Sequence, residues 1–82
     1  MTKVEDTPKE TRLKAAYERF LSSMGDQERI QFDCRFECEG TEMVITQTAF
    51  AWGGSYLRAL LHALEGTQFT FVMMSKDELR VI

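Results

Sequence analysis

The stretch "RIQFDCRFECEG", Arg29 to Gly40, decides the fold of this chain. Apolar and polar side chains alternate through it without a break. The apolar positions are Ile30, Phe32, Cys34, Phe36 and Cys38. A period of two residues over this length is typical of a strand with one buried and one exposed face. We therefore expect a half-buried strand over about residues 30 to 39.

A second β-prone run follows directly, so the two runs predict a hairpin. The residues Glu39 to Glu42 form a turn signal, and "MVITQTAF", Met43 to Phe50, supplies the second strand. A turn of two residues and a loop of four give the same pairing parity. Under either alternative, Met43, Ile45 and Ala49 belong to the buried face.

An amphipathic helix is predicted ahead of the hairpin, over about residues 8 to 24. Thr7 is placed to act as N-cap, and Pro8 to occupy the first helical position, where its missing N–H costs nothing. An apolar stripe with helical spacing follows. Gly25 is placed to end the helix in the left-handed conformation. Residues 1–6 show no periodicity, and we expect them to be a flexible tail.

A second helix is predicted after the hairpin. Gly53 and Gly54 are expected to adopt unusual backbone angles, with Ser55 as N-cap and Trp52 as an aromatic lid at this junction. A leucine-rich stripe then continues to Gly66, which closes the helix.

Two short strands complete the pattern. The run "QFTFVMM" predicts a third strand with Phe69, Phe71 and Met73 on one face, and "LRVI" predicts a fourth. The fold class is α+β, with two amphipathic helices packed on a three- to four-stranded, mainly antiparallel sheet in the order α-β-β-α-β-(β). Residues 7–82 are expected to form a single domain.

Length and charge narrow the classes of function. The chain has 82 residues and a formal net charge of −3, with no basic stripe. Direct binding of nucleic acid is therefore disfavoured, because capture of the phosphate backbone needs clustered Lys and Arg. No apolar stretch approaches the ~20 residues that span a bilayer. We expect a cytoplasmic protein without a membrane partner.

The two cysteines do not predict a redox or metal site. Cys34 and Cys38 on one strand would lie ~13 Å apart, at ~3.3 Å per residue, too far for a disulfide or for sharing one zinc ion. The expected role of both is that of small buried core residues with inert thiols. A catalytic pair with His62, the single histidine, is therefore disfavoured.

Carboxylates gather at the tip of the predicted hairpin. Glu37, Glu39 and Glu42 lack the spacing of a calcium loop, and a hairpin tip is usually solvated. They predict an acidic edge that could speed association with a basic partner. We expect no catalytic residue, metal or cofactor, and hence no enzyme.

The sheet face away from the helices is the predicted partner-binding surface, unless one helix covers each face. Its residues are Asp33, Arg35, Glu37, Val44, Thr46, Thr48, Phe50, Val72 and Met74. The leading hypothesis is a small cytosolic non-enzymatic protein-interaction module. It would bind another protein or its own copy, and an acidic inhibitor or regulator of a larger protein or nucleoprotein complex fits the composition.

Two alternatives of other classes remain open. One is a small-ligand or anion-binding or catalytic domain that uses the helix entrance Trp52 to Ser55 together with His62. Free amides and the helix dipole meet at such an entrance, although the lysine of a phosphate-binding loop is missing. The other alternative is a structural homodimer subunit.

Overall fold

The computed structural model describes residues 8–49 and 51–82, and it confirms the predicted α+β fold and the order α-β-β-α-β-β. A one-turn helix that the sequence analysis missed is inserted after the first helix. The elements are α1 (Lys9–Ser22), α2 (Asp26–Arg29), β1 (Phe32–Glu37), β2 (Glu42–Gln47), α3 (Gly54–Leu64), β3 (Phe71–Met73) and β4 (Glu78–Val81). The expectations for residues 1–6, Thr7 and Phe50 lie outside the described residues.

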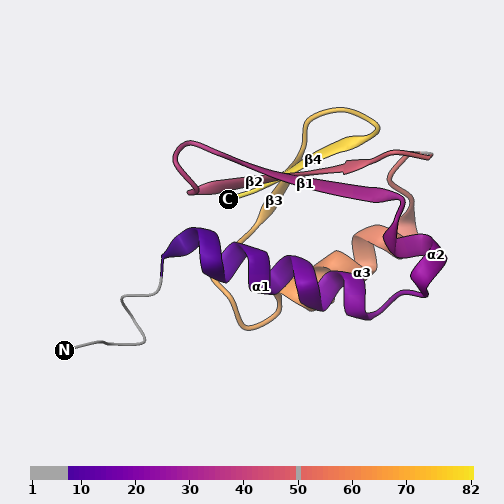
Figure 1. Cartoon of the computed structure of the whole chain (residues 1–82), viewed down its shortest axis with the longest axis horizontal. Helices are drawn as coiled ribbons and strands as arrows, with labels where there is room; N and C mark the ends of the chain where they lie inside the picture. The colour runs from indigo at the N-terminus through magenta and orange to yellow at the C-terminus, as the bar shows by residue number, and fades with distance from the viewer. Residues whose placement is uncertain (1–7, 50) are drawn as a thin grey trace.

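The four strands form one antiparallel sheet in the order β1-β2-β4-β3, so β1 and β3 are its edges. Helices α1 and α3 lie side by side on one face of this sheet (Figure 1). The alternative with one helix on each face is therefore wrong. The opposite face carries no helix in the described part of the chain.

The core fills the space between the two helices and the sheet. Phe20 and Phe32 pack on Trp52, with ring centroids 5.6 Å and 5.1 Å from its ring. Trp52 is only 8% exposed, so it belongs to the core and is not a lid. The other buried apolar side chains of this core are Leu13, Ala16, Met43, Ile45, Leu60, Ala63, Leu64, Leu79 and Val81.

The first helix begins and ends differently from the prediction. It begins at Lys9 with Pro8 as N-cap, and Ser23 is its C-cap. Gly25 is not left-handed: its φ of −73° and ψ of 163° make it the N-cap of α2. The side chain of Glu28 accepts a hydrogen bond from the Gly25 N–H at 3.2 Å, which stabilises this separate turn.

The insertion of α2 also shortens the first strand. Ile30 follows α2 directly and is 79% exposed, whereas the alternation had placed it on the buried face. The strand begins only at Phe32. The alternating pattern thus extends two residues further than the strand itself, because the local hydrogen bonds of the turn take precedence over the pattern.

The hairpin uses the four-residue loop. Glu37 pairs with Glu42, and Cys38, Glu39 and Gly40 all have positive φ, at 54°, 58° and 89°. Cys38 therefore leaves the strand and is exposed, which corrects its expected burial. At the other end β2 stops at Gln47, so Ala49 is exposed rather than buried.

The segment that leads into α3 has ordinary backbone angles. Gly53 is the N-cap, with an extended backbone at φ −103° and ψ 172°, and Ser55 lies inside the helix. Neither Gly53 nor Gly54 has a positive φ, so the prediction of unusual angles is wrong. Gly66 follows the helix, as predicted, and has a positive φ of 80°.

Candidate interaction surface

The uncovered face of the sheet carries alternate side chains of all four strands. We call it the open face. The register places on it Asp33, Arg35, Glu37, Glu42, Val44, Thr46, Val72, Glu78 and Arg80. Six of the nine predicted partner-binding residues are thus brought together: Asp33, Arg35, Glu37, Val44, Thr46 and Val72.

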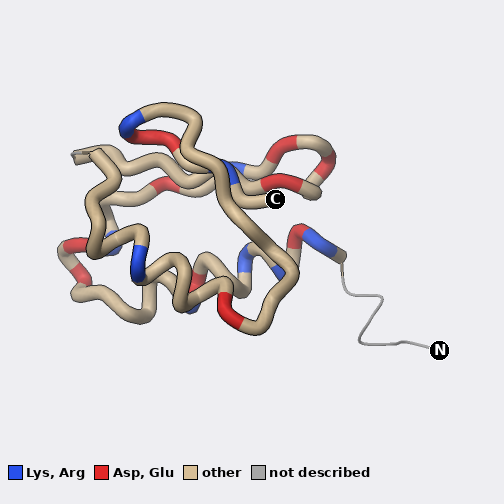
Figure 2. Tube along the Cα trace, turned by 180° about the vertical axis from the view of Figure 1, so that it is seen from behind, with Lys and Arg blue, Asp and Glu red and all other residues tan. Residues whose placement is uncertain are grey.

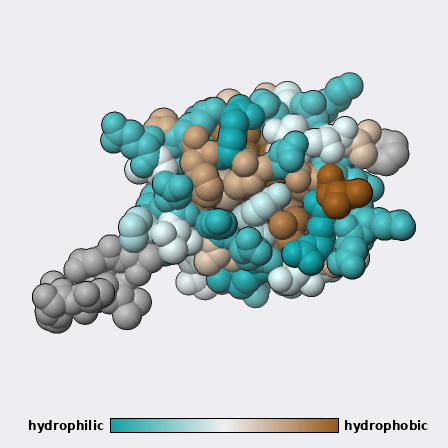
Figure 3. Space-filling view, in the orientation of Figure 1, coloured by the Kyte–Doolittle hydropathy of each residue, from teal (hydrophilic) through white to brown (hydrophobic). Residues whose placement is uncertain are grey.

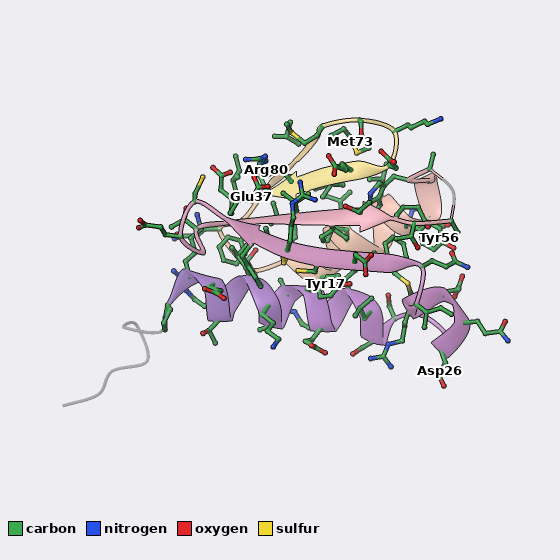
Figure 4. All side chains as sticks on the ribbon, turned by 45° about the horizontal axis from the view of Figure 1, so that its top comes forward. Tyr17, Asp26, Glu37, Tyr56, Met73 and Arg80 are labelled. Atoms are coloured by element: carbon green, nitrogen blue, oxygen red, sulfur yellow. The ribbon has the colours of Figure 1, made fainter. Side chains whose placement is uncertain are left out.

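A network of ion pairs crosses the centre of the open face. Arg35 contacts Glu37 at 3.0 Å and Glu78 at 3.3 Å. Arg80 contacts Glu37 at 2.9 Å and also pairs with Glu42. Figure 4 shows Glu37 and Arg80 next to each other on this face. We call these five residues the charge network.

The charge network contains more acidic than basic groups. The hydrogen bond from Arg35, together with the positive charge of Arg80, lowers the pKa of Glu37 below its ordinary value of 4.5. The hydrogen bond to Glu42 raises the pKa of Arg80. Three carboxylates face two guanidinium groups, so one negative charge is not compensated within the network.

Val44 is buried although it lies on the open face. It is 1% exposed, and its lateral neighbours in the sheet are Arg35 and Arg80. Long arginine side chains cover apolar surface with their methylene stems, which accounts for this burial. The expectation that Val44 contributes an accessible apolar centre is therefore wrong.

Two of the remaining predicted residues lie beyond the strands. Thr48 follows β2, and both its hydroxyl and its N–H donate to the carbonyl of Gln31, at 3.0 Å and 2.7 Å. Met74 follows β3, is 51% exposed, and donates its N–H to the carbonyl of Glu78 at 2.9 Å.

Exposed apolar side chains gather instead at the β3 end of the sheet. The exposed fractions are 48% for Val72, 41% for Met73, 51% for Met74 and 37% for Ile82. Thr70 and Ile82 exchange two backbone hydrogen bonds of 2.9 Å, which places Ile82 beside this strand. We call these four apolar residues the β3 apolar edge.

The β3 apolar edge was only partly foreseen. Val72 and Met74 were predicted to belong to the partner-binding surface, but Met73 was placed on the other face, with Phe69 and Phe71, and Ile82 on no surface. Met73 shares the face of Leu79, its partner in β4, which is fully buried. The difference arises because β3 is the outer strand, and outer strands have a neighbour on one side only.

Charge and hydropathy are distributed unevenly over the molecule. Figure 2 shows acidic positions gathered at the β1–β2 hairpin. Figure 3 shows, on the side where α1 faces the viewer, an apolar band between α1 and the sheet with hydrophilic side chains around it. Tyr17, Cys34 and Phe36 are among the partly buried apolar side chains that pack against the core.

An open groove of about 660 Å³ lies between α1 and α3, on a separate part of the surface. It is lined by Arg19, Ser22, Ser23, Ser55, Arg58, Ala59, His62 and Ala63. Arg19 donates two hydrogen bonds to the carbonyl of Ala63, at 3.2 Å and 2.9 Å. Of the residues named for an anion or catalytic site, Ser55 and His62 share this groove, whereas Trp52 is in the core.

The cysteines are free and differ in environment. Cys34 is half-buried, and burial raises its pKa to about 11. Cys38 is exposed, and a hydrogen bond with Glu42 raises its pKa. Over residues 8–49 and 51–82, no three His, Cys, Asp or Glu side chains are grouped so that they could hold a metal ion. Within the same ranges, no helix has the length and apolar character to cross a membrane.

The chain matches no family model, no curated protein and no solved structure.

Proposed function

We propose that this chain is a small, non-enzymatic protein-interaction module that binds a partner through the β3 apolar edge and the adjoining charge network. The observation that carries the proposal is the clustering of Val72, Met73, Met74 and Ile82 along the outer strand of the sheet, with Val72 on the face that no described helix covers. Contiguous exposed apolar surface on a small protein is usually a contact site.

The charge network determines which charge the partner should carry around this contact. It lies beside the β3 apolar edge, because Arg80 is the lateral neighbour of Val72. An apolar centre with a charged rim is the usual anatomy of a protein interface. The uncompensated negative charge favours a partner with a basic rim, as a regulator or inhibitor of a larger protein or nucleoprotein complex would require.

A cytoplasmic location is part of this proposal. Cys34 and Cys38 are both free thiols in one small domain. Thiols remain reduced in the cytosol, whereas secreted domains of this size usually use disulfides.

Capture from a cell lysate by the immobilised protein tests the proposal. The double variant Val72→Asp/Met74→Asp removes the apolar contact, and we expect it to lose the partners that the native chain retains. Ile30→Asp is the matched control, since Ile30 is exposed apolar surface outside the β3 apolar edge. Equal capture by the native chain and the double variant would contradict the proposal.

A second candidate function rests on the groove between α1 and α3. Arg19 and Arg58 contribute positive charge there, beside the hydroxyl of Ser55, whereas the hydroxyls of Ser22 and Ser23 donate to the carbonyls of Glu18 and Phe20. Guanidinium and hydroxyl groups together suit a phosphate or carboxylate ligand. Titration with inorganic phosphate, followed by amide NMR, would show shifts at Ser55 and Arg58 that disappear in Arg58→Ala. The absence of shifts at ~10 mM phosphate would exclude a site of useful affinity.

A further inference from the structure

The backbone of β3 has hydrogen-bonding groups that face away from the sheet. Thr70 exchanges two hydrogen bonds with Ile82, and Met74 donates to Glu78. Val72, which is opposite Arg80, lies between these two pairs. In an antiparallel ladder, alternate residues bond to the neighbour and the others point outward. The N–H and C=O groups of Phe71 and Met73 therefore point toward the free edge, where no described strand lies.

We propose that this edge pairs with β3 of a second copy of the chain. The two strands run antiparallel about a two-fold axis at Val72, so that Phe71 exchanges two hydrogen bonds with Met73 of the second copy. The symmetry repeats the same pair on the other side of the axis. The two sheets then continue through β3 into one. This inference rests on the proposed function and names a second copy as an occupant of the β3 apolar edge alone; the charge network takes no part in this contact.

The outward-facing groups of β3 and its uncharged sequence make this strand compatible with a second copy. Phe71 and Met73 lie symmetrically about Val72, so an identical strand satisfies both in one register. Residues 66–75 carry no charge, so no like charges meet when this segment faces itself. Val72 meets Val72, and the exposed methionines are flexible enough to fill the space around it.

The two edge strands of the sheet, β1 and β3, differ in how strongly they hinder pairing with another chain. At the other edge, β1 places Asp33, Arg35 and Glu37 along the open face. Charged side chains on an edge strand hinder pairing with another chain. β3 has neither a charge nor a proline. Pairing with another chain is therefore hindered at β1 but not at β3.

The dimer is expected to be weak. The contact involves a three-residue strand and side chains that are only about half exposed. It therefore buries less than the ~1,200 Å² of a stable interface. We expect a dissociation constant between about 10 μM and 1 mM, so that assembly depends on concentration.

Disulfide trapping tests the register directly. In a Cys34→Ser/Cys38→Ser background, Val72→Cys places one thiol opposite its own copy, with α-carbons ~4.5 Å apart, a spacing that a disulfide accepts. Mild oxidation should give a covalent dimer. Thr70→Cys is the control, because Thr70 then faces position 74 of the second copy and lies ~13 Å from its own counterpart. Failure of Val72→Cys to cross-link, or equal cross-linking at both positions, would overturn the register.

Sedimentation equilibrium of the full chain gives a test that does not depend on the cysteine variants. The native chain should pass from monomer to dimer between about 10 μM and 1 mM. Met73→Pro removes an outward-facing N–H without removing a bond to β4, so it should remain folded and monomeric. Ile30→Lys should dimerise like the native chain. A native chain that stays monomeric at ~1 mM would overturn the inference. Partner capture that depends on Val72 would still support the proposed function in that case.

Discussion

Arg80 on β4 reaches across β2 to Glu37 on β1, with a nitrogen–oxygen distance of 2.9 Å. These two strands are not neighbours, so the ion pair passes over the middle strand. Val44 lies in that strand, paired laterally with Arg80, and is 1% exposed. The charge network therefore covers apolar surface in the place where a second layer of structure would otherwise be needed.

Replacing Arg80 with alanine should lower stability by uncovering Val44. The expected result is a lower urea midpoint for Arg80→Ala, because both the ion pairs and the covering methylene stem are lost. Glu78→Gln removes one exposed ion pair and leaves the cover in place, so it should change the midpoint little. Equal effects of the two variants would show that the stem of Arg80 does not protect Val44.

The same network makes stability depend on pH. Arg35 and Arg80 lower the pKa of Glu37 in the folded chain below its ordinary 4.5. The folded state then binds this proton less readily than the unfolded state, so the contribution is present above pH ~4.5 and lost as the pH falls through the folded pKa. Urea unfolding between pH 7 and 3 should show this decline. Glu37→Gln should have a flatter profile, and an unchanged profile would contradict the role of Glu37.

Replacing either of two glycines with alanine should change the stability of the chain by different amounts. Gly40 has φ 89°, and a Cβ added there would lie 2.6 Å from a side-chain oxygen of Glu10. Gly40→Ala should therefore destabilise the chain by about 1–3 kcal/mol. Gly53 has an extended backbone and nothing within 4 Å of an added Cβ. Gly53→Ala should change stability by less than about 1 kcal/mol, measured by urea unfolding. A similar loss in both variants would contradict the described backbone.

The cysteines should differ in reactivity. Cys38 is exposed in the hairpin loop, whereas Cys34 is half-buried with a pKa of about 11. Because a hydrogen bond with Glu42 also raises the pKa of Cys38, the difference rests mainly on exposure, and at pH 8 we expect Cys38 to react with iodoacetamide faster than Cys34. Mass spectrometry of partly alkylated protein measures the ratio of the two rates. Urea should remove the difference, and faster labelling of Cys34 in the folded chain would contradict the assigned burial.

The sequence predicted the element order because hydrophobic periodicity reports which face of an element is buried. It could not locate the ends of the elements. Gly25 is an N-cap rather than a C-terminal residue because Glu28 stabilises a separate turn. Cys38 continues the alternation in sequence but leaves the strand with φ 54°. In both places local hydrogen bonds and loop geometry override the pattern.

The sequence predicted which face of the sheet carries the candidate surface, but not which of its side chains are exposed. Alternation in β1 correctly placed Arg35 and Glu37 on the face away from the helices. The burial of Val44 could not be predicted, because it depends on Arg80, which is 36 residues further along the chain. The exposure of Met73 could not be predicted either, because it depends on the strand order, in which β3 is the outer strand.

The most direct test of a docking function for the β3 apolar edge is amide hydrogen exchange at Phe71 and Met73, followed by NMR. Both N–H groups point toward the free edge, so they should exchange rapidly in dilute protein. At concentrations near 1 mM, or with a captured partner, we expect both amides to become protected, while exchange at Ile30, which lies outside the β3 apolar edge, stays unchanged. Rapid exchange of Phe71 and Met73 under all these conditions would contradict docking at this edge.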